Sequence, residues 1–115
     1  MSTLPAQSLH QQRCTHQSGP ALPAAEQQLL LSQLQGWAID EAEPGGVLFK
    51  DFKLTDFHRT MAFVNAVAWI AHEQDHHPDM SVSYNRCGIR WSTHSVNGLS
   101  INDFICAARV DALSA

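Results

Sequence analysis

An α+β fold with the element order α-β-β-α-β-β-α is the architecture that the sequence predicts. Three stretches carry apolar residues at steps of three and four, which is typical of helices, and the third follows a capping-box pattern at residues 100–103. Between them lie two pairs of β-rich segments, each pair joined by turn residues. A chain of 115 residues suits one small domain, so we expect a functional site at its surface or at a subunit boundary.

The first helix and the first hairpin are predicted between residues 26 and 54. Closely spaced leucines predict the helix, and Gly36 suits the position that follows a helix end. Residues 37–41 and 47–54 have strand character. A proline and two glycines between them favour a turn, so the two strands are expected to pair in antiparallel fashion.

The longest helix is predicted to begin at Thr55, which can cap the first turn, with Asp56 complementing the helix dipole. Apolar residues then recur at steps of four and three over residues 57–71. Pro78 disfavours the helical conformation at the residue before it, so the helix is expected to end at His77. The negative end of the helix dipole would favour the protonated form of imidazoles placed there.

A second hairpin is predicted from residues 80–84 and 87–91, which alternate between apolar and polar side chains. We take residues 85–86 as its loop. Side chains directly opposite each other on paired strands have Cβ atoms about 4.5–5.5 Å apart. This register sets His77 opposite His94, so two histidine-bearing segments are expected to meet at the open end of the hairpin.

Charge and hydropathy exclude two classes of partner. The formal net charge of −4 leaves the chain without the basic field that non-specific nucleic-acid or anionic-membrane binding requires. No apolar run approaches the roughly 20 residues needed to cross a bilayer. We therefore expect neither direct nucleic-acid binding nor membrane insertion.

The cysteines and the N-terminal composition set the expected compartment and domain boundary. Cys14, Cys87 and Cys106 are widely spaced and form no Cys-x-x-Cys pair, which favours a reducing cytoplasm.

Residues 1–25 are rich in Gln, Ser, His and Pro, and their apolar residues follow no regular spacing. This predicts a disordered N-terminal extension ahead of a domain at residues 26–115.

A zinc site is one interpretation of the segment around residue 75. His72 and His76 satisfy the pattern His-Glu-x-x-His, in which two imidazoles one helical turn apart bind zinc and the glutamate activates water. A catalytic zinc needs a third protein ligand, for which only His94 or an isolated acidic residue is available. The proline at residue 78 also breaks the helix. A small zinc hydrolase is therefore kept as an alternative and not as the main hypothesis.

A metal-free acid/base cluster is the other interpretation. Histidine titrates near physiological pH, so a group of imidazoles can protonate a leaving group from one side and remove a proton from the other. This is the chemistry of a dehydratase. The candidate catalytic residues are His76, His77 and His94, and the polar residues beside them are Asp75, Ser92 and Thr93.

The same segments resemble the pterin-4a-carbinolamine dehydratase family. The residues that carry the resemblance are Asp75-His76-His77-Pro78, Tyr84-Asn85, Ser92-Thr93-His94 and Gly98-Leu99-Ser100 with Asp103. Gly36-Trp37 and residues 52–63 also look like the upstream part of that family's pattern. The resemblance covers roughly residues 30–113. Its one departure is His72, where the family commonly has an acidic residue.

The resemblance implies a four-stranded antiparallel sheet with helices on one face, assembled into a homodimer or homotetramer. It implies loss of water from 4a-hydroxytetrahydropterin to give quinonoid dihydropterin, a step in tetrahydrobiopterin recycling beside aromatic amino-acid hydroxylases. Acid/base catalysis would fall to His76, His77 and His94, while the segments with Asp75, Ser92 and Thr93 would hold the pterin. No metal or other cofactor is implied. Some family members also serve as dimerisation cofactors of a transcription factor, which is a second alternative.

Overall fold

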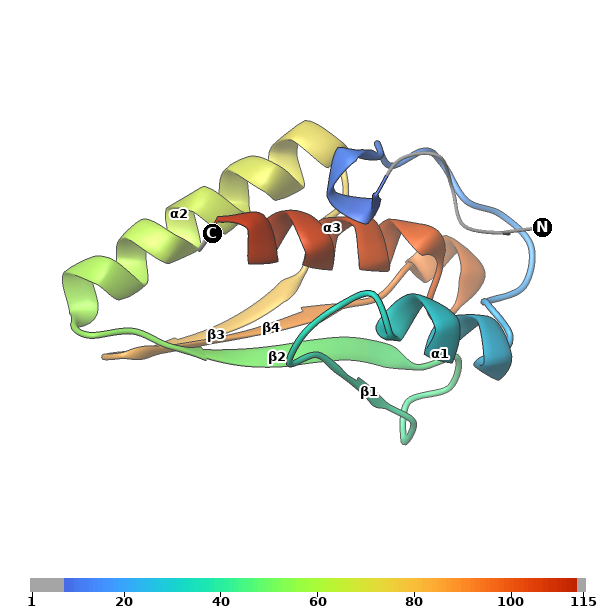
Figure 1. Cartoon of the computed structure of the whole chain (residues 1–115), viewed down its shortest axis with the longest axis horizontal. Coiled ribbons are helices and arrows are strands. Elements are labelled where there is room, and N and C mark those ends of the chain that lie inside the picture. Colours follow the sequence, from blue (N-terminus) through green and yellow to red (C-terminus); the bar gives the residue numbers. More distant parts are fainter. Residues whose placement is uncertain (1–7, 114–115) are drawn as a thin grey trace.

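A computed structural model describes residues 8–113 of the chain, and it has the α+β architecture expected from the sequence (Figure 1). Two short 3-10 helices, labelled η, accompany three α-helices and four strands among these residues. The elements in chain order are η1 Leu9–Gln11, α1 Ala24–Leu31, β1 Ala38–Asp40, β2 Val47–Lys53, α2 Phe57–Gln74, β3 Asp79–Ser83, β4 Arg86–Trp91, η2 His94–Val96 and α3 Ile101–Ala112. None of the described helices is both long and apolar enough to cross a bilayer.

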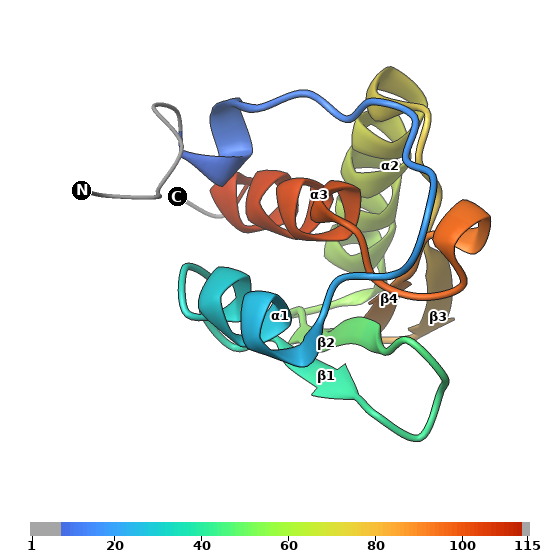
Figure 2. The same ribbon diagram turned by 90° about the vertical axis from the view of Figure 1, so that its right-hand side faces the viewer.

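The four strands form one antiparallel sheet in the order β1-β2-β4-β3. Each predicted hairpin forms, and the two hairpins join through the central pair β2 and β4. Helix α2 connects the hairpins, and it lies with α1 and α3 on one face of the sheet (Figures 1 and 2). The expected four-stranded sheet covered on one face is confirmed.

The core lies between the sheet and α3. Strand β4 alternates strictly, with Cys87, Ile89 and Trp91 buried and the two residues between them partly exposed. Phe104 and Val110 of α3 are fully buried against this surface. Burying a large apolar side chain contributes roughly 1.5–3 kcal/mol, so this layer anchors the end of β4 to the start of α3.

Both ends of α2 differ from the prediction. The N-cap is Asp56 and not Thr55, because the Asp56 carboxylate accepts the backbone N–H of Arg59 at 2.7 Å. The helix ends at Gln74 and not at His77. Asp75 adopts the left-handed conformation with φ of 50°, and the next N–H group, that of His76, bonds the carbonyl oxygen of Ala71 at 3.1 Å. This closing turn is a Schellman motif, which ends the helix before the restriction from proline applies.

The register of the second hairpin also differs from the prediction. Val82 pairs with Cys87 and Met80 pairs with Ile89, so the loop residues are Tyr84 and Asn85. The predicted register, which placed His77 opposite His94, is wrong by two positions. A shift of two leaves every side chain on its original face, so alternation alone does not distinguish the two registers. Contacts with distant residues fix it. The backbone N–H of Leu54, just after β2, donates to the carbonyl of Asn85, and the hydroxyl of Thr60 in α2 donates to the carbonyl of Tyr84.

Residues 8–22, which we call the N-terminal arm, lie along the domain (Figure 2). They were expected to belong to a disordered extension. Instead Leu9 is buried in the core, the side chain of Arg109 donates to the carbonyl of Gln12 at 3.1 Å, and the N–H of Leu22 donates to Leu99 at 2.9 Å. The apolar residues of the arm are isolated and follow neither helical nor strand spacing. The sequence pattern therefore does not reveal that they pack against α3. Residues 1–7 of the predicted extension lie outside the described residues.

Candidate active site

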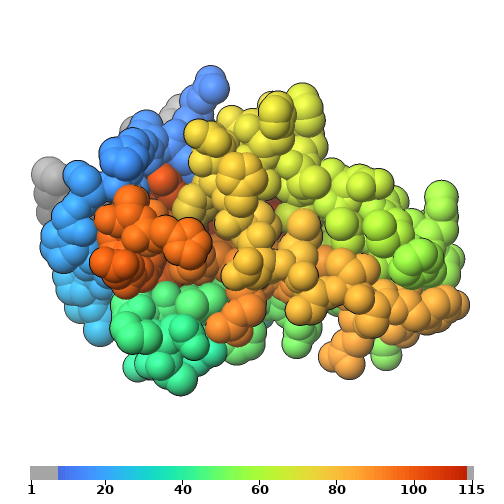
Figure 3. Space-filling view, turned by 180° about the vertical axis from the view of Figure 1, so that it is seen from behind, coloured from blue at the N-terminus to red at the C-terminus, as the bar shows by residue number. Residues whose placement is uncertain are grey.

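A pocket of about 470 Å³ opens where the end of α2, the segment after β4 and the N-terminal arm meet. These three segments adjoin on one face of the molecule (Figure 3). The six residues predicted from the sequence all line it: Asp75, His76, His77, Ser92, Thr93 and His94. The structure therefore brings together every candidate site residue.

Chain topology explains why these two segments meet. Residues 75–78 lead from α2 into β3, and residues 92–94 follow directly after β4. Because β3 and β4 are antiparallel neighbours, the start of one strand lies beside the end of the other. The expectation that both histidine groups lie at the open end of the hairpin holds, although the register differs.

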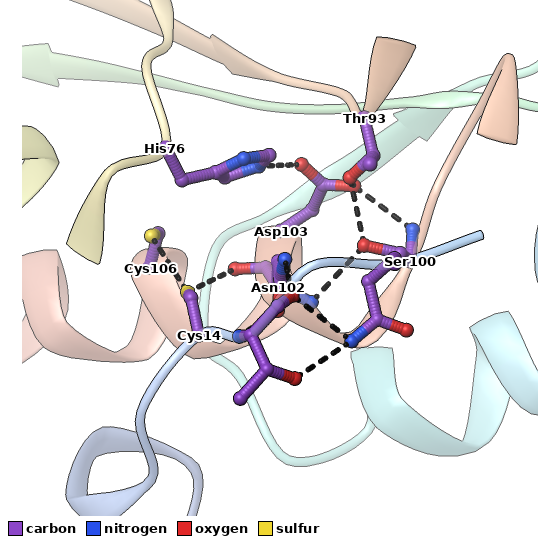
Figure 4. Close-up of polar contacts among 9 residues, drawn as sticks. Cys14, His76, Thr93, Ser100, Asn102, Asp103 and Cys106 are labelled. Atoms are coloured by element: carbon purple, nitrogen blue, oxygen red, sulfur yellow. Dashed lines mark hydrogen bonds and ion pairs between the residues drawn. The ribbon is translucent and has the colours of Figure 1, made fainter. Parts of the chain in front are cut away.

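At the inner end of the pocket, His76 pairs with a buried carboxylate (Figure 4). Its Nε2–H donates to Oδ1 of Asp103 at 2.6 Å. Asp103 is fully buried, whereas 11% of the His76 side chain is exposed. The other carboxylate oxygen, Oδ2, accepts from the hydroxyl of Thr93 at 2.8 Å and from the backbone N–H of Ser100 at 2.9 Å. Three donors thus stabilise the buried charge of Asp103.

The hydroxyl groups around Asp103 form a directed chain. Because the Thr93 hydroxyl donates to Asp103, the hydroxyl of Ser100 is the donor in its 2.7 Å contact with Thr93. Ser100 Oγ in turn accepts from the backbone N–H of Asn102 at 3.2 Å, at the start of α3. The predicted capping box at Ser100 is present, and its carboxylate also holds His76.

The pKa of His76 is raised above its ordinary value. Burial of the ring opposes this shift, but the hydrogen bond and negative charge of Asp103 outweigh it, with smaller contributions from Cys14 and Asp75. The predicted effect of the helix dipole is therefore not needed to explain the shift. The ring also stacks on Trp91, with centroids 5.5 Å apart and planes at 8°. His76 is thus a fixed imidazole that favours its cationic form.

His77 and His94 are exposed at the rim of the pocket. His94 begins η2, and the loop that carries it is closed by Thr93 and Gly98, which exchange two backbone hydrogen bonds of 2.7 and 3.3 Å. A Cβ atom at Gly98 would lie 2.5 Å from the Cα of Gly45, so the turn between β1 and β2 packs against this loop. The close contact between Gly45 and Gly98 therefore helps to fix the loop that carries His94.

The zinc interpretation is not favoured by this geometry. His72 lies on α2 and is exposed, whereas His76 lies beyond the helix end, so the two rings are not one turn apart on a continuous helix. His72 does not line the pocket; its ring lies 5.5 Å from that of Trp69. Among residues 8–113, no three His, Cys, Asp or Glu side chains are grouped to hold a metal ion.

Several pocket residues were missed by sequence reasoning. They are Gln74 and Asn102 together with Cys14, Thr15, His16 and Gln17 of the N-terminal arm. The arm is held there by side-chain amides, since Gln74 accepts the N–H of Cys14 at 2.8 Å and Asn102 donates to the carbonyl of Thr15 at 2.7 Å. No local pattern in the arm signals this role. Asp103 was noted as part of the family pattern but was not assigned to the site.

A family model and curated relatives both match this chain to pterin-4a-carbinolamine dehydratases. The family model described as pterin 4 alpha carbinolamine dehydratase matches residues 20–113. A protein of Stenotrophomonas maltophilia strain K279a with the provisional name pterin-4-alpha-carbinolamine dehydratase is 50% identical over 108 residues, covering 92% of this chain and 91% of that protein. A protein of Nitrosospira multiformis with the same provisional name is 45% identical over 103 residues, covering 88% of each chain.

Solved structures show the same fold. The crystal structure of a transcriptional coactivator/pterin dehydratase from Brucella melitensis matches with a TM-score of 0.77 and 29% identity, covering 83% of this chain and 99% of that chain. A pterin dehydratase-like protein, described as a RuBisCO assembly factor in the alpha-carboxysome, matches with a TM-score of 0.60 and 26% identity. The second match covers 70% of this chain and 92% of that chain.

Proposed function

Because this chain belongs to the pterin 4 alpha carbinolamine dehydratase family, a family of hydro-lyases, we propose that its pocket removes water from 4a-hydroxytetrahydropterin by histidine acid/base catalysis. The products are quinonoid dihydropterin and water. The observation that carries the proposal is the pair of His76 and buried Asp103 at the inner end of a pocket whose rim holds His77 and His94. No metal or cofactor takes part in the proposed reaction.

The environment of each histidine supports a division of roles. His76 has a raised pKa and one ring nitrogen bound to Asp103, so it suits an acid that protonates the departing 4a-hydroxyl through its other nitrogen. His94 lines the same pocket from the segment after β4, and in this proposal it handles the same hydroxyl from the other side. His77 positions the ring or accepts the proton that leaves the pterin nitrogen. Each positioned acid or base contributes about 10² to 10⁴-fold in rate.

The polar residues of the pocket divide into two groups. Asp75 and Ser92 line it with side chains that can accept or donate hydrogen bonds at the edge of a pterin ring. Thr93 is buried, and its hydroxyl already donates to Asp103 and accepts from Ser100. We therefore assign Thr93 to holding the carboxylate and not to direct recognition of the pterin. A pocket of about 470 Å³ lies within the range of about 300–1,000 Å³ that is typical for small ligands.

The proposal includes a homodimer or homotetramer that acts in the cytoplasm beside an aromatic amino-acid hydroxylase. Large apolar side chains on the outside of the molecule support self-association. Trp69 and Phe57 of α2 are 60% and 51% exposed, and Tyr84 at the end of the hairpin is 64% exposed. A separate role as a dimerisation cofactor would use this surface and not the histidine pocket.

A stopped-flow assay with chemically generated 4a-hydroxytetrahydropterin tests the proposed reaction. We expect the wild-type protein to accelerate dehydration, and we expect His94→Ala to lower kcat by about 10² to 10⁴-fold. His72→Ala is the matched control, because His72 is an exposed histidine of α2 outside the pocket, and it should keep the wild-type rate. Absence of acceleration by folded wild-type protein would overturn the proposal, and an active His94→Ala variant would overturn the assigned role.

A further inference from the structure

Two cysteines face each other where the N-terminal arm crosses α3. The Sγ atom of Cys14 lies 3.6 Å from the Sγ atom of Cys106, although 92 positions separate them in the sequence. Figure 4 shows the pair beside the group of residues around Asp103. A disulfide requires sulfur atoms about 2.05 Å apart, so a shift of roughly 1.5 Å would join them. Cys14 lies outside helix and strand, so this movement breaks no helical or sheet hydrogen bond at that residue.

The two thiols differ in access. Cys14 is partly exposed and lines the pocket, so a small oxidant can reach its sulfur. Cys106 is fully buried in α3, and its sulfur lies against that of Cys14. The third cysteine, Cys87, is buried within β4 and pairs with neither. The arrangement is that of an attacking thiol with a resolving thiol behind it.

The surroundings also favour the reactive form of Cys14. The hydrogen bond from the Cys106 thiol lowers the pKa of Cys14, burial and the charge of Asp103 oppose this, and His76 and Arg109 lower it further. The thiolate is the form that attacks an oxidant. The hydrogen bond to Cys14 and burial strongly raise the pKa of Cys106, so of the two thiols Cys14 is the one that ionises more readily.

We propose that Cys14 and Cys106 are an oxidation site, at which a peroxide forms a reversible disulfide that fastens the N-terminal arm to α3 beside the pocket. This inference is independent of the dehydratase reaction. Because residues 14–17 form one wall of the pocket, the disulfide fixes that wall in its place. In the reduced protein only non-covalent contacts hold this wall. The main ones are the hydrogen bonds made by the side-chain amides of Gln74 and Asn102.

The chemistry balances with hydrogen peroxide as the oxidant. The Cys14 thiolate attacks one peroxide oxygen, the O–O bond breaks, and the products are a sulfenic acid and hydroxide, which takes up a proton to give water. The sulfur of Cys106 then attacks the sulfenic sulfur, the S–O bond breaks, and the departing hydroxide takes the thiol proton as a second water. Two thiols lose two electrons, and the peroxide gains them. A thiol reductant reverses the reaction.

Peptide mapping tests the proposal directly. The full-length protein is treated with one equivalent of hydrogen peroxide, alkylated and digested with trypsin without reduction. Cleavage after Arg13, Lys50, Arg90 and Arg109 places Cys14 in peptide 14–50 and Cys106 in peptide 91–109. We expect these two peptides to be joined with a mass about 2 Da below their sum, and we expect Cys87 in peptide 87–90 to be alkylated. Dithiothreitol should separate them.

Variants and stability supply the controls. Cys14→Ser and Cys106→Ala should each abolish the joined peptide, whereas Cys87→Ala should keep it. Oxidation should raise the Tm of the wild-type protein by at least about 5 °C, since the bond closes a loop of almost the whole chain. Cys14 is only partly buried, so Cys14→Ser keeps the test valid if Cys106→Ala fails to fold. Free thiols throughout the treated wild type, Cys14 oxidised only to sulfinic acid, or Cys14 joined between two chains would each overturn the proposal.

Discussion

Asp103 is the residue through which α3 influences the pocket. Its carboxylate is fully buried, which would cost several kcal/mol for an isolated charge. Three hydrogen-bond donors, from His76, Thr93 and the backbone of Ser100, offset this cost. The side chain does not line the pocket, so we propose that Asp103 is a positioning residue that acts through His76.

Replacing Asp103 by Asn tests this role while keeping the size of the side chain. We expect the pKa of His76 to fall, because the main group that raises it has lost its charge. The kcat at neutral pH should fall by at least about 10-fold with little change in KM, and the free energy of unfolding should drop by about 1.5–3 kcal/mol. NMR titration and steady-state kinetics measure these effects. Asp51→Asn on an exposed strand position is the control, and an unchanged His76 pKa would contradict the assignment.

The pH dependence of stability follows from the same pair. His76 has a raised pKa in the folded protein and a pKa of about 6.5 when unfolded, so the folded state holds its proton more tightly. Its contribution to stability is fully present below about pH 6.5 and is lost as the pH rises through the folded pKa. Urea unfolding between pH 6 and pH 9 should show a decline in the free energy of unfolding that His76→Gln lacks. Equal slopes for the two proteins would contradict the raised pKa of His76.

The end of helix α2 shows how one element sets the position of the site. Asp75 adopts the left-handed conformation, which costs an L-residue roughly 1–2 kcal/mol, and this turn directs His76 away from the helix axis and toward Asp103. The sequence correctly indicated a break near Pro78. It did not reveal the Schellman motif three residues earlier, because that motif usually ends in Gly and here ends in Asp.

Asp75→Gly separates the backbone role of this residue from its proposed contact with substrate. Glycine adopts the left-handed conformation without steric cost, so stability should rise by roughly 1 kcal/mol. KM for the pterin should rise at the same time, because the carboxylate is lost. Asn97→Gly is the matched control, since Asn97 has a similar φ of 55° and does not line this pocket. Kinetics and denaturation measure both effects, and an unchanged KM in Asp75→Gly would remove Asp75 from the binding site.

Local sequence patterns predicted the type and order of the helices and strands. Contacts between distant residues determined the register of the second hairpin. The alternation of β4 and the capping box at Ser100 were visible in the sequence and are confirmed. The hairpin register was not, because two registers that differ by two positions give the same buried face. Thr60, whose hydroxyl donates to the carbonyl of Tyr84 at 3.0 Å, is one of the long-range contacts that select the observed register.

At the scale of the whole molecule, the pocket depends on three segments that are far apart in the chain. The sequence predicted two of them, residues 75–78 and 92–94, because the hairpin topology and the histidines both pointed to one end of the sheet. It did not predict the third, residues 14–17 of the N-terminal arm. Contacts made by polar side chains such as Asn102 hold that segment, and such contacts leave no periodic signal in the arm itself.

We propose that imidazoles from the two segments predicted from the sequence act together as one acid/base site. A double-mutant cycle on the dehydration rate, with His76→Ala, His94→Ala and the double variant, measures whether they do. Because groups that act as a unit are strongly non-additive, we expect each single change to cost about 10²-fold or more and the double change to add less than about 10-fold to the worse one. Full activity in both single variants, or losses that multiply, would contradict the claim.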